Sequence, residues 1–360
     1  MNATQSARGD RAAPVLITGG GGFIGCNIAD ALAARGTSVL VFDNMSRDGA
    51  QENATWLRQR HGDRIAVEVA DIRDTHAVRR AVAHSSAVLH LAAQVAVTTS
   101  LDHPLDDFEI NARGTLNVLE ALRNRNPRAP MVFASTNKVY GRLLAPSAFV
   151  RHGKRYIVTD ARVGRSIAET TAFDLYSPYG CSKGAADHYV RDYARVYGLR
   201  TAVLRMSCVY GPRQFGTEDQ GWIAHFMLQF IRRRPITIFG DGLQVRDALH
   251  VDDAVAAWLG ILTPIDAVRG RAFNLGGGPE NAVSLIELVD LIARMRDYAP
   301  QLRFDLKRPG DQPWYVSDTS ALSAAIGWRP RVPLQEGLRT LEQWLCSRFG
   351  AAPLTRREVA

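Results

Sequence analysis

Cysteine is scarce in this sequence, and its few copies are widely separated. The 360 residues include four cysteines, and no two of them form a CxxC pair. A disulfide framework or a cysteine-rich zinc site is therefore not expected, and the thiols are expected to be reduced, as in a cytoplasmic protein. The nine histidines show no HExxH spacing, so no metal site is expected either. The cysteines are Cys26, Cys181, Cys208 and Cys346.

Long apolar runs are absent as well. Residues 1–12 contain no apolar stretch of the kind found in secretory signals. The most apolar internal segment, 87–97, is about half as long as a membrane span and includes His90 and Gln94. We therefore expect neither a secretory signal nor a membrane-spanning segment.

The chain is basic, but it has no dense basic run. The net charge is +8, and the longest internal run of basic residues is Arg232–Arg234. A run of this size is typical of a solvated helix face, so a nucleic-acid-binding surface is not expected. The net charge is compatible with an anionic small ligand. Lysine is rare and occurs at Lys138, Lys154, Lys183 and Lys307.

What the sequence does contain is an alternation of short apolar runs with helical stretches. Strands are predicted at 15–18, 38–43, 65–70, 87–92, 131–135 and 201–205, and helices between them, for instance at 22–35, 111–125 and 179–197. Apolar runs without polar alternation are typical of parallel strands that are buried on both faces. The pattern predicts an α/β fold with a doubly wound parallel sheet.

The alternation changes after the sixth strand, where Pro and Gly interrupt shorter elements. We expect a dinucleotide-binding domain over residues 13–205, with a return to its sheet at about 247–274. A smaller C-terminal α/β lobe that binds the substrate is predicted over 206–246 and 275–350. Residues 1–12 and 351–360 are expected to be loose ends.

A glycine-rich turn follows the first predicted strand. Thr18 is followed by four glycines, and Gly19, Gly22 and Gly25 have the spacing GxxGxxG. Without side chains the backbone can turn tightly and approach a pyrophosphate. The phosphate would then meet the free N–H groups and the positive end of the next helix. In this strand–turn–helix context, the turn predicts a dinucleotide site.

Asp43 indicates which dinucleotide is bound. It ends the second predicted strand, and a carboxylate there can accept hydrogen bonds from both hydroxyls of the adenosine ribose. The same carboxylate would repel the additional phosphate of NADP. Arg47 would favour NADP, but Asp43 leads us to expect NAD. Asp71 follows the third strand and is placed near the adenine edge.

Tyr179 and Lys183 form a YxxxK pair at the start of a long predicted helix. The spacing of four places both side chains on one face. The Lys183 ammonium and a positive nicotinamide are expected to lower the pKa of Tyr179 from its usual value near 10. Thr136 follows the fifth strand, and its hydroxyl can hold the sugar oxygen that gains or loses a proton. This set, with no nucleophile or metal, is typical of alcohol–ketone interconversion by hydride transfer.

Five longer strings carry a resemblance to known proteins. They are QVAVTTS at 94–100, STNKVYG at 135–141, SPYGCSKGAAD at 177–187, RMSCVYGPRQF at 205–215 and DQGW at 219–222. With the motifs above, they make the chain resemble the extended short-chain dehydrogenases/reductases, whose cofactor domain has the Rossmann fold. Within that superfamily the strings are similar to the CDP-paratose 2-epimerase (CDP-tyvelose epimerase) family. The resemblance extends from about residue 15 to residue 349.

The resemblance implies an enzyme with tightly bound NAD, a nucleotide-sugar substrate with CDP-hexose favoured, and a role in carbohydrate biosynthesis. It also implies a homo-oligomer, either a dimer or a tetramer. The implied catalytic residues are Thr136, Tyr179 and Lys183. The cofactor would be lined by Gly19, Gly22, Phe23, Ile24, Gly25, Asp43, Asn44, Ser46, Arg47, Asp71, Ile72, Leu91, Ala92, Ala93, Gln94, Tyr179, Lys183 and Met206.

The same resemblance implies a substrate site in which Arg246 and Arg308 hold the diphosphate. Arginine suits this role because its guanidinium binds phosphate in a bidentate manner. The implied substrate residues are Gln94, Thr136, Asn137, Ser207, Arg213, Gln214, Gln244, Arg246 and Arg308.

A basic insertion at 142–176 leaves two interpretations open. It is either a solvated surface loop or a flap that covers the nucleotide. It contains Arg151, Lys154, Arg155, Arg162 and Arg165.

The predicted reaction is conversion of CDP-paratose to CDP-tyvelose, by inversion at C2 through a 2-keto sugar with return of the same hydride. A C4 epimerase of a UDP-hexose needs the same catalytic residues and remains the alternative. A nucleotide-sugar 4,6-dehydratase is less favoured, because it needs an acid–base pair in a TDEVYG string. Here Asn137 and Lys138 stand in place of those carboxylates. A non-catalytic dinucleotide sensor would be expected to lack Tyr179 or Lys183.

Overall fold

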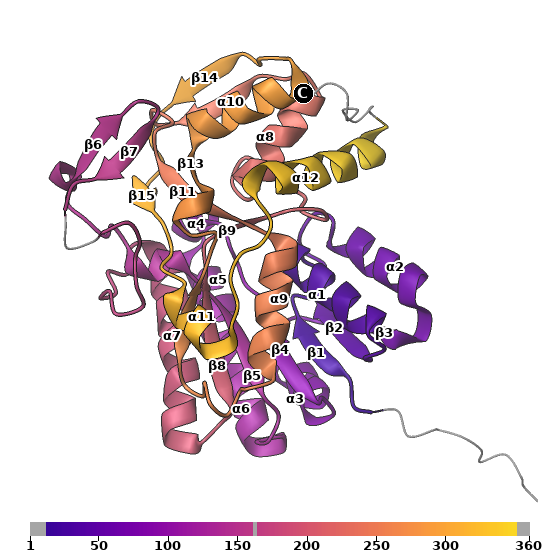
Figure 1. Cartoon of the computed structure of the whole chain (residues 1–360). Coiled ribbons are helices and arrows are strands. Elements are labelled where there is room, and N and C mark those ends of the chain that lie inside the picture. Colours follow the sequence, from indigo (N-terminus) through magenta and orange to yellow (C-terminus); the bar gives the residue numbers. More distant parts are fainter. Residues whose placement is uncertain (1–11, 161–163, 351–360) are drawn as a thin grey trace, which may run out of the picture.

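A seven-stranded sheet forms the centre of the larger part of the molecule (Figure 1). The computed structural model describes residues 12–160 and 164–350. The strand order is β12-β8-β5-β4-β1-β2-β3, and every pair is parallel. The doubly wound α/β fold predicted from the sequence is therefore confirmed. The strands are β1 (Val15–Thr18), β2 (Val39–Asp43), β3 (Ile65–Val69), β4 (Ala87–His90), β5 (Met131–Thr136), β8 (Thr201–Met206) and β12 (Ala272–Leu275).

Helices cover both faces of this sheet. One apolar core joins the sheet to α1 (Phe23–Ala34), α2 (Ala50–His61), α9 (Val251–Leu262) and α11 (Ser320–Ile326). The other joins it to α3 (Thr75–Ala83), α6 (Gly114–Arg125) and α7 (Ser177–Tyr197). The strand order changes direction between β1 and β4, because β2 follows on one side of β1 and β4 lies on the other. In open α/β sheets, ligands bind at this point, beyond the carboxyl ends of the strands.

The smaller lobe is built around β11 (Val245–His250), which the sequence had placed in the segment that returns to the large sheet. The strand instead pairs with β9 (Cys208–Tyr210), β13 (Ala282–Ser284) and β15 (Trp314–Tyr315). The return is made by α9 and β12. The lobe also contains β10 (Ile236–Phe239), β14 (Leu302–Asp305), α8 (Trp222–Ile231), α10 (Leu285–Arg296), α12 (Leu334–Phe349) and the 3-10 turn η5 (Pro279–Asn281).

The helix expected at 111–125 begins with a π-helical turn, η2 (Glu109–Arg113). Buried Asn111 explains the irregularity, since its amide nitrogen donates to the Gln94 carbonyl and to Asp107, both at 3.0 Å. π-turns of this kind are frequent at functional sites. The remaining short elements are α4 (Val97–Asp102), α5 (Pro104–Phe108), η1 (Gly62–Arg64), η3 (Asn137–Tyr140) and η4 (Pro146–Ala148).

The basic insertion forms a hairpin of β6 (Phe149–His152) and β7 (Arg155–Val158) on the outer side of the lobe (Figure 1). Arg155 forms a bidentate ion pair with Glu287 of α10, with both N–O distances 2.6 Å. Lys154 pairs with Asp290 at 2.6 Å. Arg162 lies outside the described residues, as do residues 1–11 and 351–360 of the expected loose ends.

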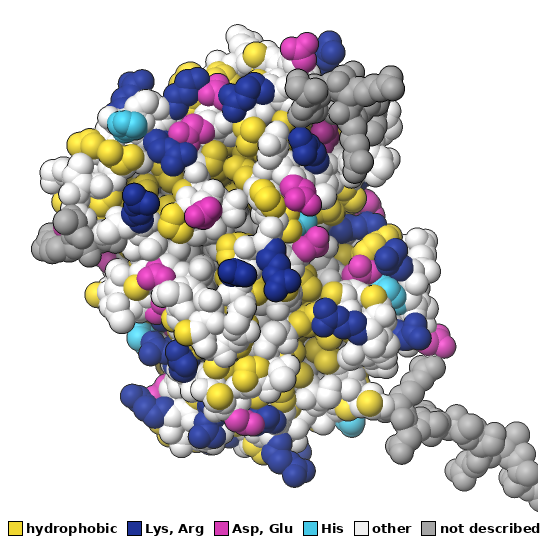
Figure 2. Space-filling model, in the orientation of Figure 1, with side chains coloured by type: hydrophobic (Ala, Val, Ile, Leu, Met, Phe, Trp, Pro, Cys, Tyr) yellow, Lys and Arg dark blue, Asp and Glu magenta, His cyan; other side chains and the backbone are white. Residues whose placement is uncertain are grey.

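The surface carries charges of both signs. On the face drawn in Figure 2, Lys and Arg side chains are interspersed with Asp and Glu, as the scattered pattern in the sequence predicts. No helix of the described residues is both long and apolar enough to span a membrane.

Candidate active site

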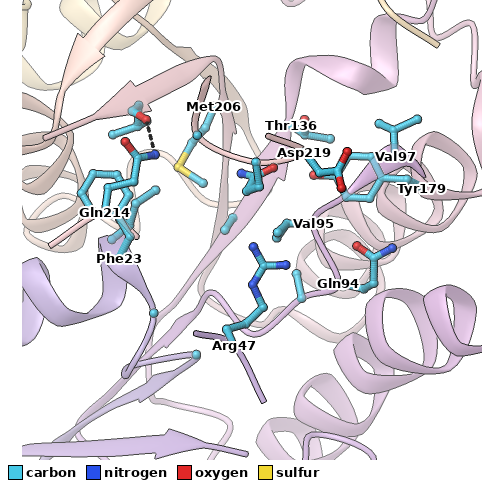
Figure 3. Close-up of a pocket in the computed structure, with 18 of the residues that line it drawn as sticks. Phe23, Arg47, Gln94, Val95, Val97, Thr136, Tyr179, Met206, Gln214 and Asp219 are labelled. Carbon is cyan, nitrogen blue, oxygen red and sulfur yellow. Dashed lines mark hydrogen bonds between the residues drawn. The ribbon is translucent and has the colours of Figure 1, made fainter. Parts of the chain in front are cut away.

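A pocket of about 690 Å³ lies between the large sheet and the lobe. It contains the strand-order change between β1 and β4, and it is closed on the other side by β9, β10, β11 and the loop that follows β14. All the residues named above as cofactor-binding, substrate-binding or catalytic line this one pocket. Figure 3 shows part of the set, including Arg47, Thr136 and Tyr179. The structure therefore brings the predicted set together, although the role of each residue stays a prediction.

The glycine turn is shaped as the sequence predicts. A Cβ atom on Gly19 would lie 2.7 Å from the backbone nitrogen of Ala92, and one on Gly25 would lie 2.4 Å from the carbonyl oxygen of Gly19. Both positions thus exclude any larger residue. Gly22 caps α1 without a side-chain hydrogen bond, which leaves the first N–H groups of the helix available for an anion. The cradle fits a dinucleotide pyrophosphate.

Asp43 ends β2 beside this turn and is 9% exposed. Its carboxylate accepts hydrogen bonds from the backbone N–H groups of Gly21 at 3.0 Å and Met45 at 2.8 Å. Burial raises the pKa of Asp43, against the lowering effect of these bonds. The contacts fix the carboxylate at the edge of the pocket, and each oxygen keeps a lone pair for a ribose hydroxyl.

The predicted catalytic residues come from two elements. Thr136 is the last residue of β5, whereas Tyr179 and Lys183 lie on successive turns of α7. The Lys183 ammonium donates to the Ala134 carbonyl at 2.6 Å, which holds it against the sheet. All three side chains are more than nine-tenths buried, so proton transfer would take place away from bulk water.

Burial controls the charge state of this set in the protein alone. It raises the pKa of Tyr179 to about 12, against a hydrogen bond with Thr136 that lowers it. It also lowers the pKa of Lys183 to about 7. In the protein without its dinucleotide, burial therefore has the largest effect on the pKa of Tyr179, and the lowering expected from Lys183 together with a bound nicotinamide stays a prediction.

A buried network of ionic and hydrogen-bonded side chains, which was not predicted from the sequence, fixes the position of Lys183. Arg205 of β8 forms a bidentate ion pair with Asp187, one turn beyond Lys183, with N–O distances of 2.9 and 3.0 Å. Asp187 also accepts a hydrogen bond from Ser135 at 2.8 Å. The network ties α7 to β5 and β8, and thus fixes the position of Lys183 relative to Thr136.

On the lobe side, the two arginines expected at the diphosphate each have a carboxylate partner. Arg246 of β11 lies 2.6 Å from Asp311, and Arg308 lies 3.1 Å from Asp219. The Arg308 guanidinium also stacks on Phe239, 3.7 Å from the ring centroid. These contacts hold both side chains in the pocket wall.

Arg213 behaves differently from these two. Its guanidinium lies 3.8 Å from the ring centroid of Trp56 on α2, a side chain that does not line the pocket. Arg213 itself lines the pocket, and the substrate contact expected for it stays a prediction.

Comparison with known proteins identifies the family. A family model described as "NAD dependent epimerase/dehydratase family" matches residues 15–276. The chain belongs to this family. The predicted superfamily, the enzymatic nature of the protein and NAD as its cofactor are thereby confirmed.

Curated members of the epimerase/dehydratase family match nearly the whole chain. A CDP-paratose 2-epimerase of Salmonella typhi is 42% identical over 92% of this chain and 99% of its own. A putative UDP-glucose 4-epimerase of Methanocaldococcus jannaschii is 30% identical over 92% and 98% of the two chains. Among solved structures, a UDP-glucose 4-epimerase of Thermus thermophilus in complex with NAD has 34% identity and a TM-score of 0.78, and covers 92% and 98% of the two chains.

Within this epimerase/dehydratase fold, the basic insertion is not part of the pocket. None of the described residues in 142–176 lines it. Arg151 and Arg165 are exposed, and Lys154 and Arg155 pair with the lobe. The interpretation of the insertion as a basic flap over the nucleotide is therefore wrong for its described residues.

Among the charged residues that line the pocket, Lys138, Asp219 and Asp311 were not predicted to bind substrate. The two aspartates could not be found by local pattern, since each meets its arginine only in the folded chain. Lys138 did carry a signal, because it stands where dehydratases have a carboxylate.

Proposed function

We propose that this chain is a CDP-paratose 2-epimerase, which inverts C2 of the hexose to give CDP-tyvelose. The observation that carries the proposal is that Thr136, Tyr179 and Lys183 line the same pocket as the arginines Arg246 and Arg308, with no carboxylate next to Thr136 in the sequence. The similarity to the CDP-paratose 2-epimerase of Salmonella typhi over 92% of the chain supports the choice of substrate.

The catalytic residues act on the C2 hydroxyl of the sugar. Tyr179, as the phenolate, takes the hydroxyl proton, and Thr136 holds the oxygen by a hydrogen bond. Lys183 stays on the Ala134 carbonyl and provides the positive charge that favours the phenolate. NAD, when bound, accepts the hydride from C2 and supplies it again for the return step.

Inversion requires that the keto sugar presents its other face before the hydride returns. The sugar therefore has to turn, while Arg246 and Arg308 keep the diphosphate in place. Their ion pairs with Asp311 and Asp219 hold the two guanidinium groups in the wall through this motion. Tyr179 then gives back the proton it took, so no second base is needed.

A C4 epimerase of a UDP-hexose is the second candidate function. Thr136, Tyr179 and Lys183 would serve C4 as well as C2, and the UDP-glucose 4-epimerases matched above share the fold over more than nine-tenths of this chain. A dehydratase is disfavoured, because elimination needs an acid–base pair where this chain has Asn137 and Lys138.

The test is a panel of CDP-, UDP- and GDP-sugars with product identification by NMR. CDP-paratose deuterated at C2 should give CDP-tyvelose that retains the deuterium, without added cofactor and without net NADH. Inversion at C4 of a UDP-hexose would replace the proposal with the second candidate. Loss of the label to water would exclude return of the same hydride.

We also propose that the enzyme is a homo-oligomer that acts in the cytoplasm. Leu105 and Phe108, next to the catalytic helix, are 80% and 50% exposed, which suits a contact between subunits. None of the four cysteines, which all belong to the described residues, forms a disulfide, as in reducing compartments. Light scattering should give a dimer or tetramer. Leu105→Asp should lower the mass, whereas Leu306→Asp, at another exposed leucine, should not.

A further inference from the structure

Lys138 lies between the catalytic residues and the lobe. It belongs to η3, which begins directly after Thr136, and its backbone N–H donates to the Thr136 hydroxyl at 3.2 Å. Its ammonium donates to the carbonyl of Gly310 at 3.4 Å, on the loop that also carries Arg308. The side chain thus reaches across the pocket from the oxygen-holding threonine to the expected diphosphate site.

The Lys138 ammonium has unused hydrogen-bonding capacity. A lysine ammonium has three N–H donors, and this one makes a single, long hydrogen bond with the described residues. It also forms no ion pair with a described carboxylate. Arg246 in the same wall, in contrast, lies 2.6 Å from Asp311. Two donors of Lys138 therefore remain for a ligand.

The surroundings of Lys138 make it energetically unfavourable for its two remaining N–H donors to stay without hydrogen bonds. Arg246 and Lys307 add positive charge nearby, and Asp311 offsets it only in part. Burial, followed by the charge of Arg246, lowers the pKa of Lys138 to about 8. A partly desolvated ammonium of this kind is stabilised when an oxygen-rich ligand accepts its hydrogen bonds.

We propose that Lys138 is a specificity-determining residue, whose ammonium donates hydrogen bonds to an oxygen of the hexose other than the reacting C2 hydroxyl. The proposal rests on the proposed function, since it assigns a contact within the same substrate. It places Lys138 against the sugar and leaves the diphosphate to Arg246 and Arg308.

The division of the pocket favours the sugar as the acceptor. Thr136 and Tyr179 are assigned to the reacting hydroxyl of the sugar. The two arginines have the bidentate geometry that suits phosphate. Lysine instead carries rotatable donors on a flexible stem. Such a group can keep a hydrogen bond to the ring while the ring turns, which an epimerase requires and a rigid donor would hinder.

The test compares the holoenzyme with Lys138→Met and Lys138→Arg in calorimetric binding of CDP and of CDP-paratose. For Lys138→Met, CDP should bind within threefold of wild type, whereas the affinity for CDP-paratose should fall about 10- to 100-fold, the usual effect of a charge-assisted hydrogen bond. Lys138→Arg should recover most of this loss. Lys154→Met is the matched control, since Lys154 pairs with Asp290 outside the pocket.

A pH profile separates this contact from a structural role. The wild-type KM for CDP-paratose should rise above about pH 8 as the ammonium of Lys138 loses its proton, and the KM of Lys138→Met should stay flat there. A structural defect would instead lower the NAD content and the unfolding temperature of Lys138→Met. Both are expected to match wild type.

Equal losses for CDP and CDP-paratose would move the contact to the diphosphate and overturn the proposal. Unchanged affinity for both ligands would overturn it as well. Failure of the proposed function has a different signature, because the wild type would then leave CDP-paratose unconverted. If the wild type acts on another nucleotide sugar, that sugar and its nucleoside diphosphate form the test pair for Lys138.

Discussion

Arg205 and Asp187 form a bidentate ion pair inside the protein, with side chains only 2% and 0% exposed. The pair lies one turn beyond Lys183 and joins the catalytic helix to β8 of the large sheet. Because neither charge can reach water, the loss of one partner leaves the other uncompensated. This ion pair therefore contributes both to the stability of the fold and to the geometry of the active site.

Asp187→Ala should destabilise the protein strongly. Removal of one member of a buried ion pair typically costs about 3–5 kcal/mol. Among the described residues, Arg205 would then keep hydrogen bonds to the Tyr140 hydroxyl and the Glu169 carbonyl, but no carboxylate partner. Urea unfolding measures the change. Asp266→Ala, which breaks the exposed pair with Arg200, should change the free energy of unfolding by less than about 1 kcal/mol. Similar effects of the two variants would contradict the importance of burial.

Tyr179→Phe should reduce kcat by about 10²- to 10⁴-fold, because it removes the group that transfers the proton and little else. The phenyl ring keeps the packing of the buried side chain, so NAD content and unfolding temperature should match wild type. Tyr189→Phe, on the same helix but 43% exposed, is the control and should retain full activity. Activity of Tyr179→Phe within threefold of wild type would assign proton transfer to another residue.

Arg246→Ala should raise KM for the nucleotide sugar and leave the NAD content unchanged. A charge-assisted bond to phosphate contributes roughly 1.5–3 kcal/mol, which corresponds to about 10- to 100-fold in KM. Arg303→Ala, at an exposed position of β14, should have no effect on KM. An unchanged KM for Arg246→Ala would place this residue outside the diphosphate site.

Buried His90 should contribute to the decrease in the free energy of unfolding at acidic pH. Its ring nitrogens bond to the hydroxyls of Thr18 at 2.7 Å and Thr115 at 3.0 Å, and burial lowers its pKa to about 3. Between pH 6.5 and 3 the unfolded chain binds a proton here and the folded chain does not. The free energy of unfolding therefore falls as the pH falls, by up to about 1.4 kcal/mol per pH unit.

His90→Gln should make that pH dependence shallower. Urea titrations between pH 6.5 and 4.5 measure the slope for wild type, for His90→Gln and for His84→Gln, which alters an exposed histidine. Only the His90 variant should differ in slope from wild type. Parallel curves for all three proteins would show that His90 does not titrate between the folded and unfolded states as proposed.

The features predicted best from the sequence are those that depend on a few neighbouring residues. The spacing of Gly19, Gly22 and Gly25 follows from the close approach of backbone to backbone at one turn, and Tyr179 and Lys183 are neighbours because a helix makes them so. Both patterns can be read without the fold. The same reasoning placed the edges of the six predicted strands within two residues of their observed ends.

What the sequence did not predict depends on contacts between distant segments. Asp311 meets Arg246, and Glu287 meets Arg155, only after the lobe has formed, so no local spacing indicates either pair. The raised pKa of Tyr179 in the protein alone was not predicted, since burial is a property of the whole fold. The placement of β11 failed for a similar reason, because an apolar strand does not specify which sheet it joins.

The late position of β12 in the sequence affects folding during synthesis and determines which fragments of the chain can fold. β12 pairs with β8 along its whole length, but the ribosome delivers it only after residues 207–271 have emerged. Until then the edge of β8 has no partner on that side, and exposed edges of this kind invite pairing with other chains. A fragment that stops near residue 210 would keep the complete glycine turn and YxxxK pair, yet we expect it to aggregate rather than to fold as a free-standing nucleotide-binding domain.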